Sequence, residues 1–343
     1  NTAKEIPSKL TFDSKPAKKA SNIRIGMIGA GSYAQKFLLP NFKSGGAEFC
    51  AIATAAGLTA RDVANQYGFV SCASDAREVI TDEKANLIVI ATRHDTHASY
   101  AQAALEQNKH VFVEKPLAMN DVELDGVLVA AEKSSGRLML GFNRRFSPLA
   151  RQAKGFFGDA RLAPLSIIYR INAGRIPKDS WIQDPIQGGG RIVGEVCHFI
   201  DLMQFLTGSV TTRVFAESVT SRNHDVTDAD SVFISLKFAD GSNGTIAYLA
   251  EGDRSVPKER VEIYGGGKTF VIDDFRRSSM HSGGREKVNK AAQDKGQKEE
   301  VRMVCETVLS GGEPPIALAD LAATTRATLR ILDSLRTGEV MDI

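Results

Sequence analysis

An apolar run that ends in a glycine turn is the feature that most limits what this chain can fold into. The run covers residues 23–28, a helix-like stretch covers residues 33–42, and between them lies the turn Gly29-Ala30-Gly31-Ser32-Tyr33-Ala34. Gly29 permits a sharp turn out of a buried strand, and Gly31 lets the backbone approach a pyrophosphate at the amino end of the next helix. Ala34 replaces the third glycine of this pattern with another small residue. The segment therefore predicts a dinucleotide site.

The sequence downstream of the turn alternates between strand and helix patterns. Short apolar runs at residues 87–91, 111–113 and 138–140 are separated by helical patterns at residues 98–107 and 122–133. Such alternation is typical of a parallel sheet covered on both faces. It predicts an α/β fold with a Rossmann domain over residues 22–141. A doubly wound domain that binds no nucleotide is the alternative.

Length and charge limit the remaining function classes. A chain of 343 residues with 43% hydrophobic content suggests two domains. Lysine and arginine number 43 against 41 acidic residues, so no strong field favours nucleic acid or an acidic membrane as a partner. No apolar stretch approaches the roughly 20 residues of a bilayer span, and no signal-peptide pattern opens the chain. We therefore expect a cytoplasmic protein.

The four cysteines are Cys50, Cys72, Cys197 and Cys305, and no two form a Cys-x-x-Cys pair. This spacing argues against a metal site, an iron–sulfur cluster or a disulfide framework. We expect buried thiols and no bound metal.

The sequence pattern changes after Arg145. Long runs rich in branched and aromatic residues, at 165–172, 212–220, 231–238, 245–249, 261–264 and 269–272, predict an antiparallel meander. One helix, residues 192–206, interrupts it and ends at Gly208. The prediction is an α+β domain over residues 142–316 with a large open, mainly antiparallel sheet. Residues 283–298 are expected to form a mobile loop.

The two ends of the chain have different sequence patterns. Residues 1–21 look like a linker or tail, whereas residues 317–343 carry a helical pattern that we expect to pack back on the first domain.

Three further motifs specify a family. Ala91-Thr92-Arg93-His94-Asp95-Thr96-His97 follows the fourth strand, Glu114-Lys115-Pro116 follows the fifth, and Gly188-Gly189-Gly190 precedes Glu195-Val196-Cys197-His198. Together with the glycine turn, and with Gly141 to Phe146 downstream, the chain resembles the glucose-fructose oxidoreductase, inositol dehydrogenase and rhizopine catabolism family (Gfo/Idh/MocA). The resemblance implies a nicotinamide cofactor, NAD or NADP, and a sugar, cyclitol or nucleotide-sugar substrate.

A narrower branch of that family is also suggested. Residues 172–177, followed by Asp179-Ser180-Trp181 and the triple glycine, are similar to a branch often fused behind a zinc-type alcohol dehydrogenase domain. The absence of a start methionine is consistent with a piece excised from such a larger chain.

The resemblance also assigns the catalytic groups. Alcohol oxidation needs a group that accepts the hydroxyl proton and a donor that stabilises the developing charge on oxygen. His198 would be the acid/base, and Lys115 would contact the substrate hydroxyl and the cofactor. The alternatives are a structural histidine and a surface lysine.

One position departs from the family pattern. The family commonly has an aspartate four residues before the histidine, and this chain has Gly194 there. Glu195, three residues before His198, is therefore the third catalytic candidate. The departure leaves open a different substrate, a relocated carboxylate such as Asp201, or a loss of catalysis.

The choice between NAD and NADP stays open. Residues 51–56 lack the acid that usually binds the ribose hydroxyl of NAD, Thr54 could bond a hydroxyl or a phosphate, and Arg61 could pair with a phosphate or simply be solvated. The residues expected to bind cofactor are Gly29, Gly31, Ser32, Tyr33, Ala34, Thr54, Thr92, His94, His97, Glu114 and Lys115.

The substrate candidates combine polar, cationic and aromatic side chains. Paired arginines suit a carboxylate or diphosphate, which suggests an anionic sugar, and Trp181 would either stack on a sugar ring or fill a core. The expected set is Asn143, Arg144, Arg175, Trp181 and Asp201.

The predicted function is hydride transfer between nicotinamide and a hydroxyl-bearing carbon of a sugar, sugar acid or nucleotide sugar. A protein that senses a dinucleotide or sugar without catalysis is one alternative, and a reductase of imines or dihydrodiols is another. An open sheet face would be exposed in a monomer, so we expect a homodimer or homotetramer.

Overall fold

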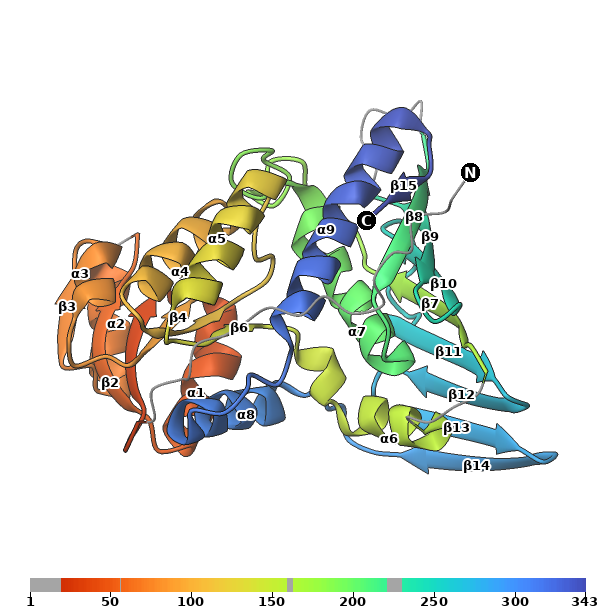
Figure 1. Ribbon diagram of the computed structural model, residues 1–343, viewed down its shortest axis with the longest axis horizontal. Helices are drawn as coiled ribbons and strands as arrows, with labels where there is room; N and C mark the ends of the chain where they lie inside the picture. Colours follow the sequence, from red (N-terminus) through yellow and green to blue (C-terminus); the bar gives the residue numbers. More distant parts are fainter. Residues whose placement is uncertain (1–19, 56, 159–162, 221–229) are drawn as a thin grey trace.

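The computed structural model describes residues 20–55, 57–158, 163–220 and 230–343. Two sheets lie side by side with helices between them, and the larger sheet forms one edge of the molecule (Figure 1). Most of the predicted tail, residues 1–19, lies outside the described residues.

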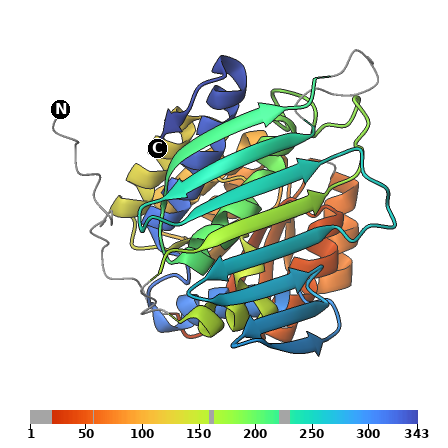
Figure 2. The same ribbon diagram turned by 90° about the vertical axis from the view of Figure 1, so that its right-hand side faces the viewer.

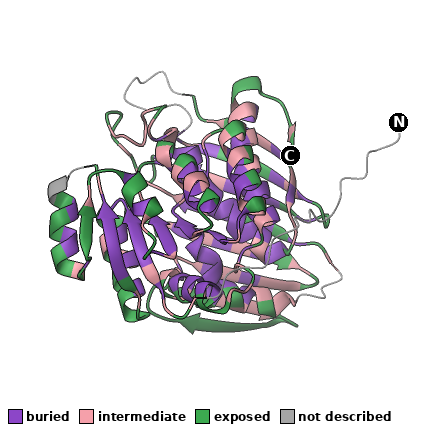
Figure 3. Ribbon diagram, turned by 60° about the vertical axis from the view of Figure 1, so that its left-hand side comes forward, coloured by how far each residue is buried: buried purple, intermediate pink, exposed green. Residues whose placement is uncertain are grey.

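The first sheet has six parallel strands in the Rossmann order β3-β2-β1-β4-β5-β6. The central strands β1 (Arg24–Ile28), β4 (Leu87–Ile90) and β5 (His110–Val113) are almost wholly buried (Figure 3). Mostly apolar side chains cover both faces of these strands, as a sheet covered on two sides requires. The outer strands are β2 (Glu48–Ala53), β3 (Ser71–Ala73) and β6 (Leu138–Leu140). The predicted Rossmann domain is confirmed.

Five α-helices accompany these strands in the described part of the first domain. They are α1 (Leu39–Ser44), α2 (Gly57–Tyr67), α3 (Ala76–Thr81), α4 (His97–Glu106) and α5 (Asp121–Lys133), and a π-helical turn, η1 (Ala34–Leu38), precedes α1. Gly29 has φ +84°, and a Cβ there would lie 2.3 Å from the carbonyl oxygen of Ala91. Only glycine therefore fits at the end of β1, which explains why the turn begins there.

The second sheet has nine strands in the order β14-β13-β12-β11-β7-β10-β9-β8-β15. Its neighbours are antiparallel except β7 (Ser166–Asn172) and β10 (Asn243–Leu249), which run parallel. The predicted open, mainly antiparallel sheet is confirmed, although this one parallel pair breaks the simple meander. The other strands are β8 (Thr211–Ser218), β9 (Val232–Phe238), β11 (Glu259–Gly265), β12 (Lys268–Asp273), β13 (Arg277–Ser282), β14 (Arg285–Lys290) and β15 (Met341–Asp342).

Among the described residues, helices cover only one face of the nine-stranded sheet. In β7, buried and more exposed side chains alternate, because the inner face packs against helices while the outer face lacks a helical cover (Figure 2). The inner layer includes α6 (Pro148–Phe157) and α7 (Cys197–Thr207), and α7 ends at Gly208 with φ +64° as predicted. A π-helical turn, η4 (Ile192–Val196), leads into α7.

Two expectations about local structure are wrong. Residues 283–298 are not a mobile loop: Gly283 and Gly284 turn β13 into β14, and α8 (Gln297–Ser310) begins before the segment ends. Every residue of β14 is exposed, so the strand is held by backbone pairing and carries no apolar pattern to recognise. Cys72 is exposed and is therefore not one of the buried thiols.

The two C-terminal helices tie the domains together. Val301, Val304 and Val308 of α8 join the apolar core of the Rossmann domain. Helix α9 (Leu318–Thr337) packs on β8 and α7, and its Arg326 and Arg330 form ion pairs with α5. The last helix thus contacts both domains. No helix among the described residues combines the length and apolarity of a membrane span.

Candidate active site

A cavity of about 660 Å³ opens where the carboxyl ends of the Rossmann strands face η4 and α7. Its lining joins the glycine turn, the segments after β4 and β5, and the start of α7, which the sequence separates by more than 150 residues. In an open α/β sheet the ligand crevice forms at this edge of the strands. The cavity is therefore the candidate active site.

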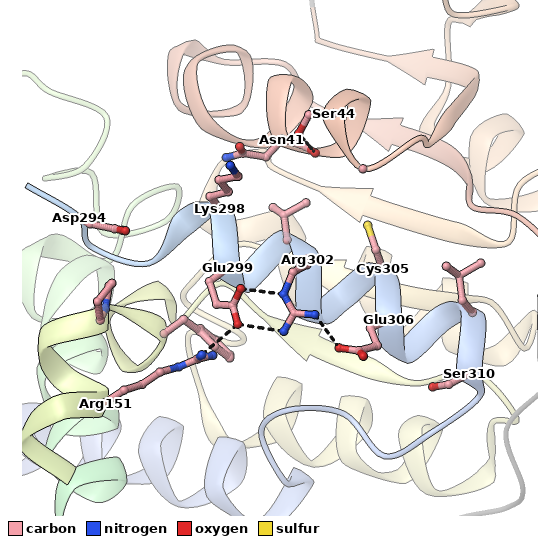
Figure 4. A pocket seen from close by; sticks show the side chains of 15 residues that line it. Asn41, Ser44, Arg151, Asp294, Lys298, Glu299, Arg302, Cys305, Glu306 and Ser310 are labelled. Carbon is pink, nitrogen blue, oxygen red and sulfur yellow. Dashed lines mark hydrogen bonds and ion pairs between the residues drawn. The ribbon is translucent and has the colours of Figure 1, made fainter. Parts of the chain in front are cut away.

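A larger hollow of about 950 Å³ lies elsewhere, between α1, α6 and α8 (Figure 4). Four of its charged side chains pair with one another: Glu299 accepts from Arg151 and Arg302, and Arg302 also donates to Glu306. It contains none of the predicted site residues. The smaller cavity therefore remains the candidate active site.

Lys115 stands at the exit of β5, just before Pro116. Its Nζ donates to the carbonyl oxygen of Gly194 at 2.9 Å, so the ammonium bridges from the Rossmann domain to the second domain. The side chain lines the cavity. An ammonium has three hydrogens, so Lys115 can donate to Gly194 and still donate into the cavity.

His198 lines the same cavity from the first turn of α7. Its ring packs edge-on against Phe142, with ring centroids 5.9 Å apart, and its buried Nδ1 has no hydrogen-bond partner. Burial, followed by the charges of Arg144 and Lys115, holds its pKa well below the usual value. The imidazole is therefore neutral near pH 7 and is able to accept a proton.

Glu195 does not reach His198. Its carboxylate accepts hydrogen bonds from Tyr248 and Lys258 at 2.5 Å each. Burial alone would raise its pKa, but the charge of Lys258 and these hydrogen bonds lower it to about 2. Glu195 is thus a permanent carboxylate held by β10 and the loop before β11, and the expected Glu195–His198 pairing is wrong.

Arg144 lines the cavity but its guanidinium is already paired. It donates twice to Glu259, at 2.7 and 3.0 Å, and Lys295 and Tyr169 donate to the same carboxylate. Both Arg144 and Glu259 are buried. A buried charge needs a partner of opposite charge. The Arg144–Glu259 pair therefore forms part of the cavity wall, and Arg144 is not free to bind an anionic substrate.

Two other substrate candidates lie outside the cavity lining. Asp201 is completely buried and accepts two hydrogen bonds from Arg145, so its place in the substrate set is wrong. Arg175 is half exposed and pairs with Glu251. Arg145 binds Asp201 in the buried interior, away from the cavity lining, and Glu251 holds Arg175 at the molecular surface. Asn143 and Trp181 do line the cavity.

The expected cofactor residues mostly surround the cavity. Ser32, Tyr33, Ala34, Thr92, His94, His97, Glu114 and Lys115 all line it, as does Gly31. A Cβ at Gly31 would meet no atom within 4 Å, so the backbone at the helix start is open to a ligand. The backbone N–H of Gly29 instead donates to the carbonyl oxygen of Ala53 at the end of β2, and Thr54 follows β2 outside the lining. These residues fit a dinucleotide whose pyrophosphate approaches Gly31.

Several lining residues were not expected from the sequence, among them Tyr248, Lys258 and Lys295. Tyr248 is an inward-facing strand residue, Lys258 lies in a loop, and Lys295 falls in the segment mistaken for a mobile loop. No local motif marks any of them. Among the described residues, no cluster of three or more histidine, cysteine or acidic side chains is arranged to hold a metal.

Two family models match the chain. Residues 23–142 match the oxidoreductase family with an NAD-binding Rossmann fold, and residues 151–271 match the GFO/IDH/MocA C-terminal domain. The fold is also that of a solved oxidoreductase domain protein from Kribbella flavida, with a TM-score of 0.82 and 21% identity over 94% of this chain and 100% of that one.

Curated relatives are about a quarter identical to this chain over the aligned residues. Inositol 2-dehydrogenase of Rhizobium meliloti is 26% identical over 75% of this chain and 78% of its own length. The uncharacterized oxidoreductase YrbE of Bacillus subtilis is 27% identical over 60% of this chain and 61% of its own. The nicotinamide cofactor and the oxidoreductase class expected from the sequence are confirmed. With a Rossmann domain and a C-terminal domain that both match, this chain belongs to the GFO/IDH/MocA family of NAD-binding oxidoreductases.

Proposed function

We propose that the protein is an NAD(P)-dependent dehydrogenase that transfers hydride between nicotinamide and a CH–OH carbon of an uncharged sugar or cyclitol. One observation carries the proposal: Lys115 and His198 face the same cavity as the open backbone of Gly31. A relative of this chain is named inositol 2-dehydrogenase, which supports a cyclic polyol as substrate.

The residues divide the chemistry between them. The bound cofactor supplies the hydride acceptor or donor. Lys115 donates a hydrogen bond to the substrate oxygen and stabilises the charge that develops there. His198, kept neutral by its burial and by its cationic surroundings, accepts the hydroxyl proton through its ring.

The charges of the cavity wall favour an uncharged substrate. Arg144 and Lys295 share Glu259, and Lys258 binds Glu195. An anionic substrate would have to compete with carboxylates that are already in place, whereas hydroxyl groups need only add hydrogen bonds. We therefore propose a neutral polyol in preference to the sugar acid or nucleotide sugar.

Turnover on matched substrates tests the proposal. Glucose, myo-inositol and levoglucosan are compared with glucuronate and a nucleotide sugar, each with NAD and NADP, by following the reduced cofactor. We expect turnover of a neutral polyol, with kcat/KM at least about tenfold above that of an acid of the same ring size. A preference for glucuronate over glucose would contradict the neutral substrate.

The variant Lys115→Met separates binding from chemistry. It should lose turnover while its affinity for NADH, measured by fluorescence, is retained. Lys133→Met is the matched control, because that lysine is exposed at the end of α5 and should leave both quantities unchanged. A wild-type chain that binds NADH and turns over none of the panel would favour the sensing role.

We also propose that the protein is a homo-oligomer that covers the outer face of the nine-stranded sheet. Ile168 of β7 and Phe233 of β9 are about half exposed on that face, which lacks a helical cover in Figure 2. Exposed apolar side chains on an open sheet favour association with a second copy.

A further inference from the structure

His94 reaches from the Rossmann domain into the second domain. It follows β4, yet its Nδ1 bonds the carbonyl oxygen of Gly188 at 2.7 Å, and its ring packs edge-on against Trp181 with centroids 4.9 Å apart. A Cβ on Gly194 would lie 2.8 Å from its Cε1. These three neighbours all belong to the second domain. By contrast, His97 bonds only first-domain carbonyls, those of Pro116 and Thr92.

The bond to Gly188 settles which nitrogen carries the hydrogen. A carbonyl oxygen only accepts hydrogen bonds, so Nδ1 of His94 donates and Nε2 keeps its lone pair. Burial, followed by the charge of Lys115, lowers the pKa of His94 to about 3, which keeps the ring neutral. Nε2 is therefore an acceptor with a fixed orientation. His198 differs, since no partner orients its ring through Nδ1.

Gly194 is what makes room for this ring. Its Cα faces Cε1 of His94, and its carbonyl receives the hydrogen bond of Lys115. Any side chain at position 194 would point into the volume that the imidazole fills. His94 and Lys115 thus contact the same residue from two sides, which places an acceptor and a donor around one part of the cavity.

We propose that His94 is a substrate-binding residue whose Nε2 accepts a hydrogen bond from a substrate hydroxyl, in the space that a side chain at position 194 would otherwise occupy. The inference rests on the proposed dehydrogenase function, and it moves His94 from the cofactor set to the substrate set.

Two single variants test the proposal: one removes the hydrogen-bond acceptor, and the other fills the space that the His94 ring occupies. In His94→Phe the ring shape is kept and the acceptor is lost, whereas Gly194→Ala adds the methyl group that displaces the ring. The substrate is myo-inositol or glucose, whichever the wild type turns over faster. Each variant should raise the KM for that polyol by about tenfold, the usual effect of one lost hydrogen bond. The Kd for NADH should stay within about twofold of wild type. His281→Phe, on the distant strand β13, is the control and should change neither.

The double variant tests the shared space directly. His94→Ala combined with Gly194→Asp places a carboxylate acceptor in the vacated volume, and it should recover a substantial part of the polyol affinity lost in His94→Ala alone. A double variant no better than His94→Ala would overturn the inference. So would an unchanged KM in His94→Phe, or a tenfold weaker NADH affinity with unchanged KM.

Failure of the proposed function gives a different result. If the wild type shows no turnover, polyol binding to its NADH complex is measured by calorimetry. Loss of that binding in His94→Phe supports the inference without any chemistry, and retention of it overturns the inference. Folding of each variant is checked by its NADH-binding stoichiometry.

Discussion

The clearest test of the site geometry is Asp201→Asn. The sequence placed Asp201 with the substrate, whereas the structure buries it completely against Arg145, which donates to both carboxylate oxygens. Burial raises the pKa of Asp201 to about 6, with Arg145 opposing the rise, so at pH 7.5 the side chain is a carboxylate. The asparagine variant keeps the shape and removes the charge that neutralises a buried guanidinium.

The expected cost follows from that burial. Leaving one member of a buried ion pair without its partner destabilises a protein by about 3–5 kcal/mol. With an unfolding entropy near 2 cal/mol/K per residue, a chain of this length loses roughly 4–7 °C of melting temperature. The companion variant Arg175→Ala breaks a pair that is 54% and 44% exposed, and it should cost no more than about 1 kcal/mol.

Thermal unfolding and steady-state kinetics on the same preparations decide the outcome. We expect Asp201→Asn to melt several degrees below wild type and Arg175→Ala to melt close to wild type. Both should keep the KM for the polyol. A normal melting temperature together with a raised KM in Asp201→Asn would refute the burial argument and return this residue to the substrate set.

Three further outcomes are expected. Lys258→Met should raise the pKa of Glu195 from about 2 toward its ordinary value, because the charge of Lys258 is the largest effect that lowers it. The titration is followed by the NMR shift of the Glu195 carboxyl carbon, and an unchanged titration contradicts the prediction. Burial and the charge of Glu114 raise the pKa of Glu300 well above 4.5. The folded state therefore retains a proton that the unfolded chain releases, and the stability of the fold decreases as the pH rises above 4.5. Glu300→Gln removes this loss, so its melting temperature relative to wild type should rise between pH 5 and pH 8, and a constant difference would count against it. Ile168→Glu should lower the mass found by light scattering if the outer sheet face is the interface, and an unchanged mass would exclude that face.

Much of the fold was open to prediction because it depends on local chain geometry. The glycine turn, the strand–helix alternation up to Gly141 and the helix that ends at Gly208 each leave a periodicity or a φ requirement in neighbouring residues. Lys115 and His198 could be found for another reason, since each sits in a short motif that resembles the family's. The exposed strand β14 could not, because backbone pairing leaves no mark on side-chain pattern.

The sequence by itself determined the two-domain plan, the cofactor-binding turn and the two groups expected to act on the substrate hydroxyl. Only the tertiary structure decided which charges are neutralised: Arg144 meets Glu259 from 115 residues away, and Glu195 turns to Lys258 instead of His198. It alone brought His94 against Gly194. The physical reason is that a buried charge or ring is governed by whatever packs around it, and those neighbours come from segments that share no local pattern.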